Sequence, residues 1–408
     1  DIFRRMQVRR RLRSTGLYET SWQDMTDFVK RWGTIDIAVD DVKLNKFRLS
    51  GINLTCRNDT GRFNDETNMS SLWFGYMTRY RSLVRIQAGY STASGELPSD
   101  GTLGVFILTD ELEQDASKNE IVLRCSSIQS VFNEVRAREL PLINTNLSAS
   151  DIITRIRDHT DGAGVSIFQQ FISTAAWVIS TTTNIYNLNT DTTLENMTCW
   201  DLMEKLAESE TFVLTINRTG GIEFRGRDAR QSTSQFGFRG QGFDQQNVIK
   251  LNGEKEALNK LYTYVRFKHL QPDTSTSYVT SGTTTSVDAT NLSWRYGQRV
   301  YEFENLFTTV TATAQTIANT AFTEYSVVRK EINFDAKLHP TLEILDRVDF
   351  SYRSYDAAFS SIWDVMVWDT DRWSREGNNF DYEQKPYKIL GKRMNLDNFS
   401  MNIKAREI

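Results

Sequence analysis

The sequence INLTCRNDTGRFNDETN, residues 52–68, runs from alternating apolar side chains into Asn58, Asp59 and Gly61 and then returns to Phe63. The alternation predicts a β-strand. The polar residues that follow suit a turn, because Asn and Asp tolerate left-handed backbone angles and Gly adopts them without steric cost. Since the same oxygen-bearing side chains also coordinate ions, the stretch alone leaves a turn and an ion-binding loop both open.

Other short alternating segments surround this stretch, each bounded by Gly, Asn, Asp or Ser. With the strand inside residues 52–68 they form the set TIDIAVD (34–40), KFRLSGINLTC (46–56), SLVRIQAGY (82–90), GTLGVFILTD (101–110) and NEIVLRCSS (119–127). Segments of this length and period predict strands. Five strands within about 100 residues are typical of a small barrel or sandwich.

Helical patterns follow these strands. Ser148 with Asp151, and Thr198 with Asp201, have the spacing of a helix-capping box, and each pair precedes apolar residues that share one helical face. Residues 211–227 then alternate around the turn RTGG and predict a hairpin. The combination predicts an α+β unit.

The remainder of the chain returns to strand patterns. The expected elements are a strand at 261–270, a long exposed Thr/Ser-rich loop at 273–290, one helix at 310–325 packed on a second barrel, a strand at 346–355 and a terminal hairpin at 387–408. These end strands echo the earlier ones, which suits a duplicated barrel, although short alternating segments also resemble each other by chance.

The predicted organisation has four parts. They are an N-terminal arm (1–33), a first β-barrel domain (34–140), an inserted α+β domain (141–246) whose polar end 227–247 is a linker or mobile loop, and a second β-barrel domain with a helix and a Trp-rich loop region (247–408). The fold class is therefore α+β, mainly β.

The composition is that of a globular protein, with 39% hydrophobic and 25% charged residues and a net charge of -4. No apolar run is long enough for a membrane span or a signal peptide. Cys56, Cys125 and Cys199 are an odd, widely spaced set, which favours core positions over disulfides. The one basic cluster, which includes Arg9 and Arg11, is interpreted as a solvated or subunit-contacting strand face rather than a phosphate site.

Catalytic and metal-binding patterns are missing from the sequence. His159, His269 and His339 have no further ligand at metal-site spacing, and no phosphate-binding loop, dinucleotide fingerprint or nucleophile elbow occurs. No cofactor is therefore expected.

One aromatic and acidic segment keeps two alternatives open. It contains Trp363, Trp368 and Trp373, with Asp364, Asp369 and Asp371 among them. This arrangement suits an aromatic anchor at a subunit contact, but also sugar stacking or the acid pair of a glycosidase.

The order of the predicted elements resembles a known family. A strand ending in Asn-Asp-x-Gly-x-Phe, followed by SLVRIQAGY and by the pair GVFILTD and NEIVLRC, resembles the first domain of the central hub proteins of tailed bacteriophages. The unit at 148–226 resembles the inserted α+β domain of that family. LYTYVRFK, LDRVDFSY and FSMNIKAREI, in this order, resemble its second tail-tube-like barrel.

The resemblance implies a structural virion protein rather than an enzyme. It implies a homotrimeric hub at the tail tip or baseplate, at the distal end of a tail tube, made in the host cytoplasm and assembled into the virion. Three chains with two barrels each match a six-fold tube to a three-fold tip or fibre and surround the DNA exit channel during DNA ejection, without specific DNA binding. The alternatives are a tail-associated polysaccharide or cell-wall hydrolase and a carbohydrate-binding adhesin.

The resemblance also gives roles to the residues singled out above. Asn58, Asp59, Gly61 and Phe63 become the turn that marks the first barrel. The candidate contacts with tail partners are Trp363, Trp368, Trp373, Arg9 and Arg11.

Overall fold

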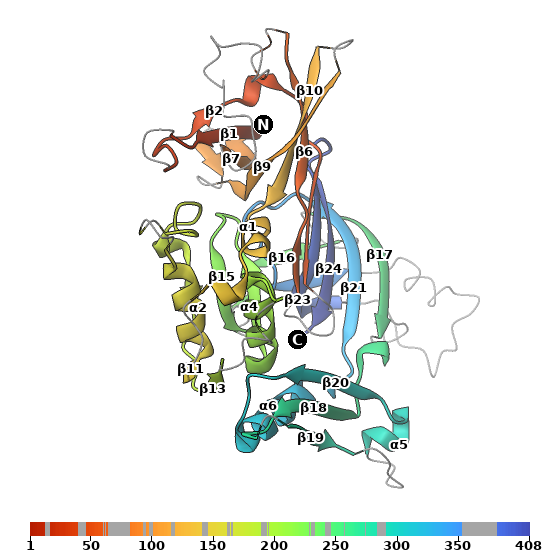
Figure 1. Cartoon of the computed structure of the whole chain (residues 1–408). Coiled ribbons are helices and arrows are strands. Elements are labelled where there is room, and N and C mark those ends of the chain that lie inside the picture. The colour runs from red at the N-terminus through yellow and green to blue at the C-terminus, as the bar shows by residue number, and fades with distance from the viewer. Residues whose placement is uncertain are drawn as a thin grey trace, which may run out of the picture.

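The protein is represented by a computed structural model. It describes residues 1–12, 17–39, 46–59, 61, 63, 82–92, 95–97, 101–115, 119–140, 146–160, 164, 166–188, 194, 196–227, 229, 233–240, 246–256, 258–273, 275–283, 291–352 and 382–408. Figure 1 shows one sheet at the top, an α+β unit on the left, a second sheet on the right and a small sheet-and-helix unit at the bottom. The predicted class, α+β and mainly β, is confirmed.

The first sheet has eight strands, in the order β2-β1-β7-β9-β10-β6-β3 with β8 added to β7. Their bounds are β1 (Ile2–Arg10), β2 (Gln23–Asp24), β3 (Val29–Arg31), β6 (Ile52–Arg57), β7 (Ser82–Thr92), β8 (Gly95–Leu97), β9 (Thr102–Asp115) and β10 (Glu120–Ser127). Alternating burial along β6 and β10 reproduces the period of two read from the sequence. The strands predicted at 82–90, 101–110 and 119–127 are confirmed, and of the strand predicted at 46–56 only the part from Ile52 onward lies in this sheet, as β6.

The second sheet also has eight strands, in the order β16-β22-β23-β24-β21-β17, with β4 and β5 joined through β23. Their bounds are β4 (Thr34–Val39), β5 (Phe47–Leu49), β16 (Phe236–Arg239), β17 (Val248–Glu256), β21 (Lys330–Lys337), β22 (Arg347–Tyr352), β23 (Tyr382–Asn395) and β24 (Ser400–Glu407). The predicted terminal hairpin is confirmed as β23 and β24. The segment 227–247, expected as a linker or mobile loop, contributes β16, which pairs in parallel with β22.

Strand β4 crosses the predicted division of the chain. The sequence boundaries placed residues 34–49 in the first barrel, but Ile37 pairs with Lys392 of β23 in the second sheet. The segment of β4 and β5, which lies between β3 and β6 in the sequence, thus belongs to the second sheet. Two closed barrels and the four domain boundaries stay predictions.

The α+β unit follows the first sheet. Its elements are α1 (Gln129–Glu134), α2 (Ala149–Asp158), α4 (Cys199–Glu210), β11 (Asn146–Ser148), β12 (Val178–Ile179), β13 (Ile185–Asn187), β14 (Phe212–Ile216) and β15 (Ile222–Gly226). Both predicted capping residues begin helices: the side chain of Ser148 accepts from Asp151 N–H, and Thr198 forms a complete capping box with Asp201. The predicted hairpin is β14–β15.

A separate small unit lies between β17 and β21. It holds the sheet β19-β18-β20 and two helices, with bounds β18 (Tyr264–Leu270), β19 (Thr276–Gly282), α5 (Leu292–Tyr296), β20 (Val300–Asn305) and α6 (Thr311–Tyr325). Its buried residues form their own apolar cluster, to which Phe267 of β18, Phe303 of β20 and Ile317 of α6 belong. The helix prediction is confirmed, but the helix packs on β18 and β19, and the predicted loop 273–290 was wrong where β19 forms.

One continuous core joins the two large sheets and the α+β unit. The β14–β15 turn shows how the contact is made. At Gly220, φ is +86°, and a Cβ there would lie 3.1 Å from Cβ of Val105 in β9. Only glycine combines this backbone angle with so close an approach. Cys56, Cys125 and Cys199 are buried in the same core, as predicted.

A buried carboxylate joins the small unit to the second sheet. Glu331 of β21 is 2% exposed, and its carboxylate lies 2.6 Å from Nζ of Lys260 and 3.0 Å from a guanidinium nitrogen of Arg406. Lys255 and Lys404 stand farther away, at 3.8 and 4.0 Å. Loss of this carboxylate would leave buried cations without their counter-charge, which is costly.

We expect Glu331→Gln to lower the free energy of unfolding by about 3 kcal/mol, because Lys260 and Arg406 then remain buried without a counter-charge. Urea unfolding monitored by tryptophan fluorescence measures this. Glu120→Gln is the control: its partner Lys30 is partly exposed, so the loss should be below about 1 kcal/mol. Equal losses in both variants would contradict the assigned role of Glu331.

We expect Gly61→Val to destabilise the fold by about 1–2 kcal/mol, because φ at Gly61 is +63° and a β-branched residue is strained there. Gly237→Val is the matched control, since a Cβ at Gly237 meets no atom within 4 Å. A chelator such as EDTA should leave the stability of both proteins unchanged. A stability loss on chelation would instead support ion binding at the turn.

Candidate functional site

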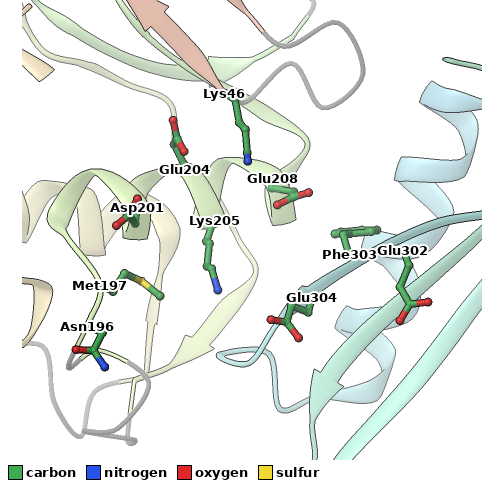
Figure 2. A pocket seen from close by; sticks show the side chains of 10 residues that line it. All are labelled: Lys46, Asn196, Met197, Asp201, Glu204, Lys205, Glu208, Glu302, Phe303 and Glu304. Atoms are coloured by element: carbon green, nitrogen blue, oxygen red, sulfur yellow. The ribbon is translucent and has the colours of Figure 1, made fainter. Parts of the chain in front are cut away.

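A cavity of about 550 Å³ opens where α4 faces β20. Figure 2 shows its lining side chains, with α4 of the α+β unit on one side and β20 of the small unit on the other. We call this space the α4–β20 cleft. It is lined by Lys46, Asn196, Met197, Asp201, Glu204, Lys205, Glu208, Glu302, Phe303 and Glu304.

One face of α4 supplies the first wall. Asp201, Glu204, Lys205 and Glu208 line the cleft together, because residues three, four and seven positions apart lie on the same side of an α-helix. The opposite side of α4 is apolar and buried, as Leu206 shows. Packing of that apolar side fixes which charged residues face the cleft.

Strand alternation supplies the second wall. Tyr301 is 5% exposed and packs in the apolar cluster of the small unit, whereas Glu302 and Glu304 are exposed. Glu302 lies 3.7 Å from Arg266, and Glu304 lies 3.3 Å from Lys268. Exposed pairs of this kind contribute little stability, so both carboxylates remain accessible to another cation.

Two hydrogen bonds hold the walls together. The hydroxyl of Tyr301 donates to Oε1 of Glu208 over 2.8 Å. The side-chain amide of Asn305 donates to Oγ of Ser209, and both of these residues are buried. Because buried polar groups are costly to leave unbonded, these contacts fix β20 against the C-terminal part of α4.

Glu204 has the most perturbed carboxyl of the cleft. Burial raises its pKa to about 7, and the nearby carboxylates of Asp201 and Glu208 act in the same direction. A hydrogen bond of 2.7 Å from Nε1 of Trp200 and the charge of Lys46 oppose the rise. The cleft therefore holds a carboxyl that is only partly ionised at neutral pH.

A second cavity, of about 630 Å³, lies between the β14–β15 hairpin and α6. Its charged lining residues are Arg227 and Glu324. Burial opposes ionisation of Glu324, but a 2.8 Å bond from Arg329 and the charges of Lys388 and Arg227 outweigh burial and lower its pKa. These groups join three parts of the fold, and we assign them a structural role.

Hydrogen bonds join Asn58, Gly61 and Phe63, which follow β6. Asn58 is buried, its N–H donates to the carbonyl of Asn119, and its Oδ1 accepts from the N–H of Phe63 over 3.0 Å. The N–H of Gly61 donates to the carbonyl of Asn58. Asp59 is exposed, and the ring of Phe63 is buried edge-on against Phe28.

The two arginines predicted to contact partners have neighbours within the chain. The guanidinium of Arg9 lies over the ring of Trp22 and donates to the carbonyl of Glu19. Arg11 donates to Oε1 of Gln170 in the α+β unit over 2.6 Å. Their contacts with other proteins stay a prediction. Trp363, Trp368 and Trp373, with the intervening aspartates, lie outside the described residues.

The histidines occupy ordinary positions. His269 is fully buried in β18, with Nδ1 3.0 Å from the carbonyl of Leu270. Burial, helped by the charge of Lys392, lowers the pKa of His339 to about 4.

Within the described ranges, no group of three or more His, Cys, Asp or Glu side chains is placed to hold a metal ion. Nor does any helix in these ranges have the length and apolar character needed to cross a bilayer.

The α4–β20 cleft was not predicted from the sequence. Two signals for it exist: acidic residues at helical spacing in WDLMEKLAESE, residues 200–210, and alternating glutamates in YEFEN, residues 301–305. Each of these charge patterns is also common on a helix or strand face that is exposed to solvent. Only the tertiary fold brings them together.

Comparisons with known proteins give the fold. No family model and no curated protein match the sequence. The structure of the tail protein from Neisseria meningitidis MC58 matches with a TM-score of 0.54 and 10% identity, over 99% of this chain and 96% of that chain.

Two other solved structures match less closely. The 43 kDa tail protein of prophage MuSo2 from Shewanella oneidensis has a TM-score of 0.49 at 10% identity, over 99% and 98% of the two chains. The prophage tail protein gp18 from Listeria monocytogenes EGD-e has a TM-score of 0.48 at 14% identity, over 98% and 94%. The match to the Neisseria structure shows that this chain has the fold of a tail protein, as the sequence resemblance implied.

Proposed function

We propose that the chain is a structural virion protein that forms a trimeric hub at the distal end of a phage tail tube. The observation that carries this proposal is the fold match to a tail protein over nearly the full length of both chains. A match of this extent includes both large sheets and both smaller units. The proposed location is the tail of the virion, after synthesis in the host cytoplasm.

The two large sheets support a role in symmetry matching. Each has eight strands, and one apolar core joins them. Three copies of a chain with two such sheets present six sheets to a six-fold tube and three equivalent surfaces to a tip or fibre. In this role the protein acts through matched surfaces and needs no catalytic group.

The charge balance supports passage of DNA through the proposed ring. The net charge is -4, so the chain as a whole offers no excess of cations for phosphates. Binding of DNA through release of counterions needs clustered lysines and arginines. A ring with few such clusters along its channel lets DNA slide.

The edge of the second sheet offers a surface for contact between subunits. β17 is the longest of the strands that end the paths of the two large sheets, with nine residues against two, three and four for β2, β3 and β16. An edge strand presents unpaired backbone groups that bind further chains. Ile249 on β17 is 61% exposed, and burial of this side chain would favour assembly.

We expect the purified protein to have three times the mass of one chain by native mass spectrometry, and three-fold rings by electron microscopy. Ile249→Asp should weaken the trimer at least about tenfold, because a charge would be buried at the interface. Val327→Asp is the control, since Val327 is also exposed but lies outside the second sheet. A monomer at all concentrations, together with tail tips that lack a labelled chain, would refute the proposed hub.

A further inference from the structure

The outer edge of β20 is open. In the parallel pair with β18, the N–H of Tyr264 donates to the carbonyl of Arg299. Alternate residues of a strand bond to the same neighbour, so the odd-numbered residues of β20 face β18. The backbone N–H and C=O groups of Glu302 and Glu304 therefore point away from the sheet. Among the described residues, no strand pairs with this edge.

The space beside this edge is hollow. Glu302, Phe303 and Glu304 line the α4–β20 cleft, and α4 forms the opposite wall. Its volume of about 550 Å³ lies within the range of ligand sites. A groove between an open strand edge and a helix is a geometry in which extended peptides bind as an added strand.

The charge of the cleft determines which peptides fit it. Five carboxyl side chains face it against two lysines: Asp201, Glu204 and Glu208 with Lys205 on α4, Glu302 and Glu304 on β20, and Lys46 before β5. The carboxyls stand on both walls. Side chains of an added strand alternate between its two faces, so cations at alternate positions would meet them.

We propose that the α4–β20 cleft binds an extended, lysine- or arginine-bearing segment of another protein, which pairs with the open edge of β20 as a fourth strand. Main-chain hydrogen bonds to Glu302 and Glu304 supply register. The acidic side chains of both walls supply charge selectivity. This inference rests on the cleft alone and does not require the trimeric assembly.

The test measures binding of a labelled, end-capped hexapeptide of alternating lysine and valine to the full chain by fluorescence anisotropy. We expect saturable binding that a glutamate–valine hexapeptide does not show. The double variant Glu302→Gln, Glu304→Gln should weaken binding roughly tenfold or more. The charge-matched control Asp27→Asn, Asp36→Asn changes two exposed carboxylates away from the cleft and should bind as the wild type does.

A backbone-methylated peptide separates strand addition from simple charge attraction. Methylation of alternate amides removes the donors that an added strand needs but keeps every lysine. We expect binding to be lost with the methylated peptide. Equal binding of both peptides, equal binding by the Glu302/Glu304 variant, or no binding up to about 1 mM would overturn the proposal.

The pH dependence gives an independent check. A lysine of the bound peptide favours the ionised form of Glu204, whose pKa is raised to about 7 by burial. Binding should therefore strengthen as the pH rises from 6 to 8, and Glu204→Gln should flatten this dependence. The charged side chains that act on Glu204 within the chain are Asp201, Glu208 and Lys46. A profile that is unchanged in Glu204→Gln would contradict the assigned role of Glu204.

Discussion

The architecture depends on one strand, β23, because two other strands pair with successive parts of one of its edges. β22 pairs with the first part of β23, from Tyr382 to Lys388, and β4 pairs with the last part, from Gly391 to Asn395. β24 occupies the other edge. Hydrogen bonds of a central strand cannot be left unmade in a buried sheet without cost. The last part of the C-terminal hairpin therefore requires a strand from the N-terminal third of the chain.

This shared edge explains why the two large sheets have one core. Once β4 is fixed on β23, the chain returns through β6 into the first sheet, and the two sheets stay close. The β14–β15 turn then fills the space beside β9, where only Gly220 fits. Charged groups join the small unit to the second sheet, through Glu331 and Glu324. Buried ion pairs of this kind define geometry more than they add stability.

Local patterns predicted local structure well. The strands of residues 82–127, both capped helices and the terminal hairpin follow from periods of two and 3.6 residues and from side chains that bond to their own backbone. β19 was missed because its Thr and Ser residues read as a loop, although Val279 alternates inward to meet the core of the small unit. The Thr/Ser composition is compatible with a strand wherever a neighbour covers one face.

The position of β4 and the α4–β20 cleft could not be predicted for a different reason. Pairing of Ile37 with Lys392 and the approach of Glu208 to Tyr301 join segments far apart in the sequence. Their local patterns are common to many exposed strands and helices. Tertiary packing determines which segment each of them pairs with, and the local sequence of either segment does not identify that partner.

The small unit begins and ends at one place in the second sheet. β17 ends at Glu256 and β21 begins at Lys330, and these two residues are paired partners across the ladder. For the sheet, the whole unit is thus the loop of a hairpin, and closing a loop becomes costlier by only about 0.6 kcal/mol for each doubling of its length. A different folded unit can therefore be inserted between β17 and β21. Such an insertion would give a new binding specificity and leave the second sheet unchanged.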